Sequence, residues 1–107
     1  MVDYPLTVTC DARDGGWRCS VVVGDDASAT EHSVEVDRAT LGDLAPGATP
    51  AELIRESFVY LLEREPRESI MRAFELPMIA RFFADYPDAI SHRLGPSDGQ
   101  GRRPEAS

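Results

Sequence analysis

Three residues of types that bind metals or act as nucleophiles occur in the first third of the chain: Cys10, Cys19 and His32. Each occupies an alternate position of a segment with strand-like patterning, so the three side chains can share one face of a sheet. A structural zinc site needs four ligands and usually a closely spaced cysteine pair. Here eight residues separate the cysteines, and only three candidates exist. We therefore predict no metal and no cofactor.

The cysteines also bear on the compartment. The first residues lack the basic and apolar stretches of an export signal, and cysteines without such a signal are typical of a reducing cytoplasm. We expect a cytoplasmic protein in which Cys10 and Cys19 are free, buried thiols. A disulfide between them is also feasible if they face each other across a hairpin.

Other arrangements that support catalysis are absent from the sequence. It contains no Gly-x-Ser-x-Gly motif and no glycine-rich phosphate loop. The oxygen-rich run at 25–31 lacks the glycine and the alternation of a calcium loop. We predict no catalytic residues and a protein that is not an enzyme. A small enzyme with an unidentified site is the third hypothesis.

The charge balance narrows the class of partner. Nineteen acidic residues face eleven arginines, and there is no lysine, so the formal net charge is -8. This field repels phosphate and disfavours nucleic-acid binding, whereas it favours solubility and basic partners. No apolar run has the length of a membrane-spanning helix, so we predict no membrane partner.

Three strands are predicted within residues 4–37. Apolar residues alternate with polar ones over 6–12 and 17–23, which is the pattern of half-buried strands. Between them, Asp14-Gly15 is a strong signal for a two-residue hairpin turn. In this register Cys10 faces Cys19, although a turn at Gly15-Gly16 would also keep the apolar faces aligned. A third alternating segment follows at 31–37.

The clearest helix start is Thr49-Pro50-Ala51-Glu52, which has a capping residue, a proline in the first turn and a capping-box glutamate. It predicts a helix from Pro50 to about Glu65, ended by Pro66, whose apolar stripe covers the sheet. The connector at 38–49 is expected to contain one helical turn around residues 41–44.

Residues 66–92 are predicted to form a second helical layer. We expect a short helix over Arg67–Phe74, a corner at Leu76-Pro77, and a helix over 77–86 that Pro87 ends. A further turn or two could follow to residue 92. The expected whole is one α+β domain over residues 1–94, with the sheet at 4–37 and helices within 50–92, and a disordered tail at 95–107.

Residues 70–90 are unusually apolar, since sixteen of the twenty-one are apolar or proline. One interpretation is that they form the centre of the core. The other is that some stay exposed and dock a protein partner, because large exposed apolar patches mark partner sites. On the second interpretation the chain is a homodimer or an accessory subunit. The interaction surface would then comprise Met71, Phe74, Met78, Phe82 and Tyr86.

Two short resemblances suggest another class. The opening Tyr4-Pro5-Leu6-Thr7-Val8, with the later Asp14-Gly15-Gly16-Trp17, resembles the first hairpin of HicB-type antitoxins. The segment from Ile70 to Ile79 looks like a degenerate helix-turn-helix, whose second helix offers one arginine, Arg81. Together they imply an antitoxin-like or transcriptional regulator, which is the alternative to a protein-interaction module.

Overall fold

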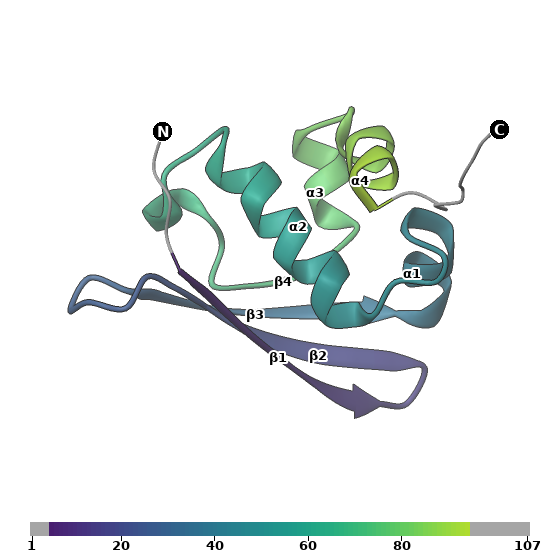
Figure 1. The fold of residues 1–107 in the computed structure, drawn as a ribbon, viewed down its shortest axis with the longest axis horizontal. Helices are drawn as coiled ribbons and strands as arrows, with labels where there is room; N and C mark the ends of the chain where they lie inside the picture. Colours follow the sequence, from purple (N-terminus) through teal and green to yellow (C-terminus); the bar gives the residue numbers. More distant parts are fainter. Residues whose placement is uncertain (1–4, 95–107) are drawn as a thin grey trace, which may run out of the picture.

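Residues 5–94 are described by a computed structural model of the chain, whereas residues 1–4 and the predicted tail at 95–107 lie outside the described residues. The described part is a four-stranded sheet with four α-helices (Figure 1). In chain order the elements are β1 (Leu6–Arg13), β2 (Gly16–Val23), β3 (Thr30–Asp37), α1 (Arg38–Leu44), α2 (Pro50–Leu62), the 3-10 turn η1 (Arg67–Ser69), β4 (Ala73–Glu75), α3 (Met78–Phe82) and α4 (Tyr86–Leu94). The expected α+β class is confirmed.

The first three strands form the predicted antiparallel meander. β1 pairs with β2 in the register that sets the turn at Asp14-Gly15, so Cys10 faces Cys19. Gly15 has a φ of 77°, a left-handed conformation that this turn needs and that glycine adopts without steric cost. The alternative register, with its turn at Gly15-Gly16, is wrong.

Cys10 and Cys19 form a disulfide, with their Cα atoms 4.0 Å apart. The expectation of two free thiols is therefore wrong. The hairpin register explains the bond, because facing residues at a non-hydrogen-bonded position of an antiparallel pair come closest together. Disulfides are rare in a reducing cytoplasm, so this bond is at odds with the predicted cytoplasmic location. Within residues 5–94 no helix is long and apolar enough to cross a bilayer.

The connector after β3 is more helical than predicted. The expected single turn at 41–44 is the end of α1, which begins at Arg38. Asp37 starts this helix, because its carboxylate accepts a hydrogen bond from the backbone N–H of Thr40 at 2.7 Å. Hydrogen bonding to Thr40, through its side-chain hydroxyl and then its backbone N–H, holds the pKa of Asp37 below its ordinary value.

α2 is the main cover of the sheet, as predicted. Its capping box is present, since Thr49 and Glu52 exchange side-chain and backbone hydrogen bonds. The apolar stripe is buried through Leu53, Ile54, Phe58 and Leu61. The helix ends at Leu62, three residues before the predicted end, and a turn continues the chain to Glu65.

The predicted helix over Arg67–Phe74 is wrong. Only a 3-10 turn forms at Arg67–Ser69, and Ala73–Glu75 is a strand that runs parallel to β3 with Phe74 opposite Val34. Phe74 and Leu76 are buried while Ala73 is exposed, which is the alternation of a strand. The degenerate helix-turn-helix at 70–79 is wrong for the same reason, because its first helix does not exist.

The predicted helix over 77–86 is two helices, α3 and α4. Phe83 has an extended backbone and ends α3. Pro87 does not end a helix but lies in the first turn of α4. Backbone N–H groups in a first turn have no acceptor within the helix, so proline, which has no N–H, fits there. The chain therefore turns between the two helices at residues 83–85.

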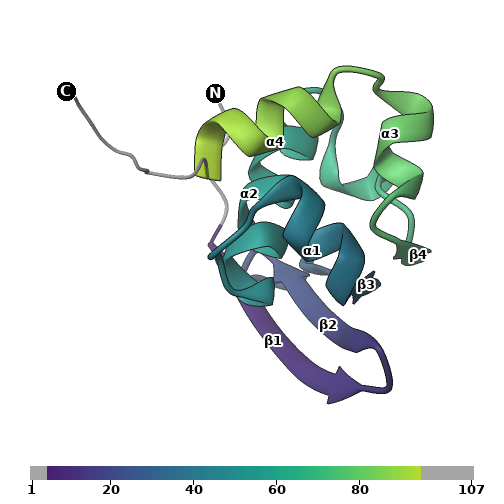
Figure 2. The same ribbon diagram turned by 90° about the vertical axis from the view of Figure 1, so that its right-hand side faces the viewer.

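All the helices lie on one face of the sheet (Figures 1 and 2). The opposite face carries exposed polar side chains such as Thr9 and Ser20, and an ion pair joins Arg18 and Glu35 at 3.0 Å. Figure 2 shows the turn end of the β1–β2 hairpin extending beyond the helices. The apolar core therefore lies in a single layer between the sheet and α2, α3 and α4.

Candidate functional site

An apolar groove of about 200 Å³ opens on the helical side of the molecule. It lies between the C-terminal end of α2, the segment that leads into β4, and α3. Its lining residues are Leu61, Glu65, Ser69, Ile70, Met71, Phe74, Ile79, Phe82 and Phe83. Because three separate segments supply these side chains, the groove exists only in the folded chain.

Two large apolar side chains remain exposed at this groove. Met71 is 41% exposed and Phe82 is 66% exposed. Within residues 5–94 these are the only large hydrophobic residues in that state, and both line the same groove. Singly scattered apolar residues are normal on a protein surface, whereas these two line the same groove.

The structure separates the five predicted docking residues. Met71, Phe74 and Phe82 line the groove, although Phe74 is only 9% exposed. Met78 is half-buried beside the core and does not line it. Tyr86 is fully buried, so it belongs to the core and has no surface to offer a partner.

Glu65 is the groove residue that the sequence analysis missed. Its side chain is half-buried, and burial raises the pKa of its carboxyl above the ordinary value. Its carboxylate makes no hydrogen bond or ion pair within the described part of the chain, residues 5–94. A signal was present, since Glu65 continues the spacing of Phe58 and Leu61 and so falls on the apolar stripe of α2.

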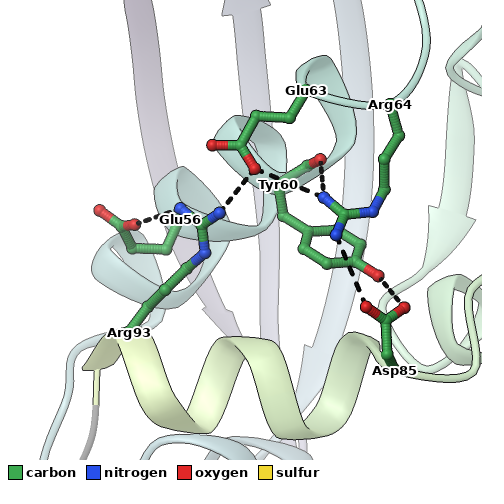
Figure 3. A network of polar contacts seen from close by, with 6 residues as sticks. All are labelled: Glu56, Tyr60, Glu63, Arg64, Asp85 and Arg93. Atoms are coloured by element: carbon green, nitrogen blue, oxygen red, sulfur yellow. Dashed lines mark hydrogen bonds and ion pairs between the residues drawn. The ribbon is translucent and has the colours of Figure 1, made fainter.

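A polar network next to the groove links α2 and the turn after it to the segment that follows α3 (Figure 3). The hydroxyl of Tyr60 on α2 donates to Asp85, in the α3–α4 turn, at 2.6 Å. The guanidinium of Arg64 lies 3.6 Å from the centre of the Tyr60 ring and 3.5 Å from the Asp85 carboxylate. The turn that follows Phe82 and Phe83 is thereby attached to α2.

The same network sets the ionisation of its members. Burial, aided by the hydrogen bond to Asp85, raises the pKa of Tyr60 to about 12. The bond from Tyr60 lowers the pKa of Asp85. At neutral pH the pair is therefore a neutral phenol that donates to a carboxylate.

Arg93 attaches α4 to α2 further along the helix pair. Its guanidinium lies 2.6 Å from the carboxylate of Glu63 and 3.7 Å from that of Glu56 (Figure 3). All three side chains are partly exposed, so each pair contributes little alone. Together with the Tyr60 contacts they hold α4 in one position.

His32 fixes the opposite side of the groove. Its Nδ1 donates to the backbone carbonyl of Met71 at 2.8 Å, and its Nε2 accepts from the hydroxyl of Thr30 at 2.9 Å. These roles follow from the neutral ring, because burial lowers the pKa of His32 despite the opposing bond to Met71. Arg72 lowers the pKa further. Both ring nitrogens are thus occupied, and His32 positions the backbone of Met71.

Arg67 closes the loop between β2 and β3. Its buried guanidinium donates to the carbonyl of Val23 at 3.2 Å and lies 3.7 Å from Asp26. A side chain at Gly24, whose φ is 97°, would collide with this guanidinium.

The cysteines and His32, which could share one face, do not form a metal site, since the cysteines are bonded to each other. No set of three metal-binding side chains comes together within residues 5–94.

Comparison with known proteins gives no match, because no family model, no curated protein and no solved structure is similar to this chain. The resemblance of the first hairpin to HicB-type antitoxins therefore remains a prediction.

Proposed function

We propose that this chain is a non-enzymatic protein-interaction module and that the groove between α2, β4 and α3 is its docking site. One observation carries the proposal: the two exposed large hydrophobic residues within residues 5–94, Met71 and Phe82, both line this groove. Leaving them in water forgoes roughly 25 cal/mol for each square ångström of apolar surface. A partner that covers them recovers that free energy.

The surroundings of the groove support this role. Tyr60, Arg64 and Asp85 fasten the turn after α3, and His32 fastens the carbonyl of Met71. A groove whose walls are fixed before binding loses less conformational entropy when a partner docks. The exposed apolar residues are therefore presented on a formed surface.

The three ionisable groups that fasten the elements around the groove, Tyr60, Asp85 and His32, are poorly suited to acid–base catalysis. General acid–base catalysis works best when the pKa of the catalytic group is close to the working pH. Tyr60 has its pKa raised to about 12 and Asp85 has its pKa lowered, so both lie far from neutrality. His32 is buried with both ring nitrogens bonded, which leaves it no free nitrogen for a substrate.

Photochemical crosslinking in the cells that produce the chain tests the proposal. The photoreactive residue p-benzoylphenylalanine replaces Phe82 in one variant and Thr9, on the open face of the sheet, in the control. We expect crosslinked products from position 82 and none from position 9. No product from position 82, or equal products from both, would contradict the proposal.

A further inference from the structure

We propose that the groove receives a segment of a different protein that inserts one apolar side chain between Met71 and Phe82 and sets an arginine or lysine against Glu65. This inference rests on the proposed docking function and adds the chemistry of the partner. It depends on the unpaired carboxylate in the wall, on the size of the groove and on the charge of the molecule.

The carboxylate of Glu65 is the first reason. It is half-buried beside Leu61 and Ile70 without a hydrogen bond or ion pair within residues 5–94. A carboxylate that loses water without gaining a partner is costly, and burial accordingly raises its pKa. A cation from the partner would restore the lost interaction at the moment of docking.

The neighbouring acids show that this state is particular to Glu65. Glu63 binds Arg93 at 2.6 Å, and Glu68 lies 3.4 Å from Arg67. Both flank Glu65 in the sequence and both use an arginine of this chain. Glu65 lines the groove and uses none within residues 5–94, so its carboxylate is available to a cation from a partner.

The size of the groove indicates a side chain rather than a small molecule. Small-molecule sites commonly enclose roughly 300–1,000 Å³. At about 200 Å³ this groove is smaller, and it matches one large anchor residue of a docked segment. Anchors of this kind, with a charged residue beside them, supply most of the affinity of many interfaces.

The net charge favours a different protein over a second copy. The chain carries a formal charge of -8, and two such molecules repel each other, whereas a basic partner is attracted. Met71 and Phe82 therefore favour a partner segment with an apolar side chain. Glu65 and the negative net charge of the chain favour a segment that also carries a basic side chain.

The test is a selection from a displayed library of random twelve-residue peptides on the purified full chain. Three variants are run in parallel: Glu65→Gln, the groove variant Met71→Ser/Phe82→Ser, and the control Glu31→Gln on the open face of the sheet. We expect the wild type and the control to enrich peptides that pair an aromatic or branched aliphatic residue with arginine or lysine. Glu65→Gln should keep the apolar preference and lose the basic one.

A binding measurement on one selected peptide sharpens the result. Replacement of its arginine by citrulline should weaken binding to the wild type and to Glu31→Gln by about tenfold, as for a close ion pair at an interface. The same replacement should change binding to Glu65→Gln by less than about twofold. Since citrulline is placed in the peptide, its effect on the wild type does not depend on how a variant folds, and binding of the apolar residue shows that Glu65→Gln is folded.

The outcomes separate the inference from the docking function. Enriched peptides without basic residues, or an equal effect of citrulline on Glu65→Gln, would overturn the role of Glu65 and leave the docking groove standing. No enrichment over Met71→Ser/Phe82→Ser, for a chain that also stays monomeric as its concentration rises, would overturn both. The chain could instead fail to enrich peptides and form a dimer at higher concentration that is lost in Met71→Ser/Phe82→Ser. That result would show that the groove binds a second copy of the chain and would overturn the inference of a different protein.

Discussion

The hydroxyl of Tyr86 lies 2.6 Å from the Oγ of Ser57, and both side chains are fully buried between α4 and α2. Ser57 has a single hydroxyl proton and donates it to the carbonyl of Leu53 at 2.7 Å, so Tyr86 is the donor in their shared bond. Tyr86 also packs edge-on against Tyr60, with ring centres 5.3 Å apart. It therefore anchors α4 to the core, which is why it cannot serve as a docking residue.

This contact predicts unequal effects of two substitutions. Tyr86→Phe removes one hydrogen bond and leaves Ser57 bonded to Leu53, so it should lower the free energy of unfolding by about 1 kcal/mol. Ser57→Ala leaves the buried hydroxyl of Tyr86 without a partner and should cost more, about 1–3 kcal/mol. Chemical denaturation of both variants measures the order. A smaller loss for Ser57→Ala than for Tyr86→Phe would show that the hydroxyl finds another partner.

The disulfide predicts a dependence of stability on redox conditions. Cys10 and Cys19 are nine positions apart, and closing a loop of that length stabilises a fold by about 2–3 kcal/mol in the chain-entropy account. A reductant should therefore lower the midpoint of thermal unfolding for the wild type. The double variant Cys10→Ala/Cys19→Ala should not respond to it. Two titratable thiols in the protein folded without reductant would contradict the bond.

The buried histidine predicts a loss of stability in mild acid. The pKa of His32 is lowered in the folded state, so below the ordinary value of about 6.5 the unfolded chain binds the additional proton. The free energy of unfolding should fall as the pH decreases through that range, by at most about 1.4 kcal/mol per pH unit. At higher pH this contribution is fully present.

Two variants test whether His32 causes this dependence of stability on pH. His32→Gln should flatten the dependence on pH between 7 and 5, while His92→Gln, at an exposed position of α4, should retain the wild-type slope. Urea denaturation at a series of pH values provides the comparison. Equal slopes for all three proteins would mean that His32 stays protonatable in the fold.

The N-terminal half could be predicted from the sequence because its signals are local. Period-two alternation defines β1 and β2, and Asp14-Gly15 favours the observed register, although the sequence alone left the turn at Gly15-Gly16 open. The capping box at Thr49 and Glu52 fixes the start of α2. Each of these features depends on residues a few positions apart, so one chain without relatives is sufficient to find them.

Residues 70–90 could not be assigned because sixteen of the twenty-one are apolar or proline, so neither the helical period nor the strand period stands out. β4 forms through distant contacts: Phe74 faces Val34 on β3, and Phe74 packs near Phe58 with ring centres 6.3 Å apart. The local hint was Pro77, which disfavours helical backbone at the preceding residue.

The docking residues were predicted only in part, because the exposure of an apolar side chain also depends on distant contacts. Apolar density left open whether residues 70–90 are core or partly exposed; most of their large apolar side chains are buried or half-buried, and Met71 and Phe82 are exposed. It could not separate them from Tyr86, because that distinction depends on Ser57, twenty-nine positions away. Glu65 was not predicted as a groove residue, although its spacing from Leu61 is that of neighbours on one helix face and it lines the groove.

The central claim is that a partner covers Met71 and Phe82. Hydroxyl-radical footprinting compares their oxidation in the purified chain and in the living cells that produce it, with half-buried Trp17 on the distant hairpin as the reference. We predict strong oxidation of Met71 and Phe82 in the purified chain and a several-fold decrease in cells relative to Trp17. Equal oxidation of the groove residues in both samples would contradict the claim.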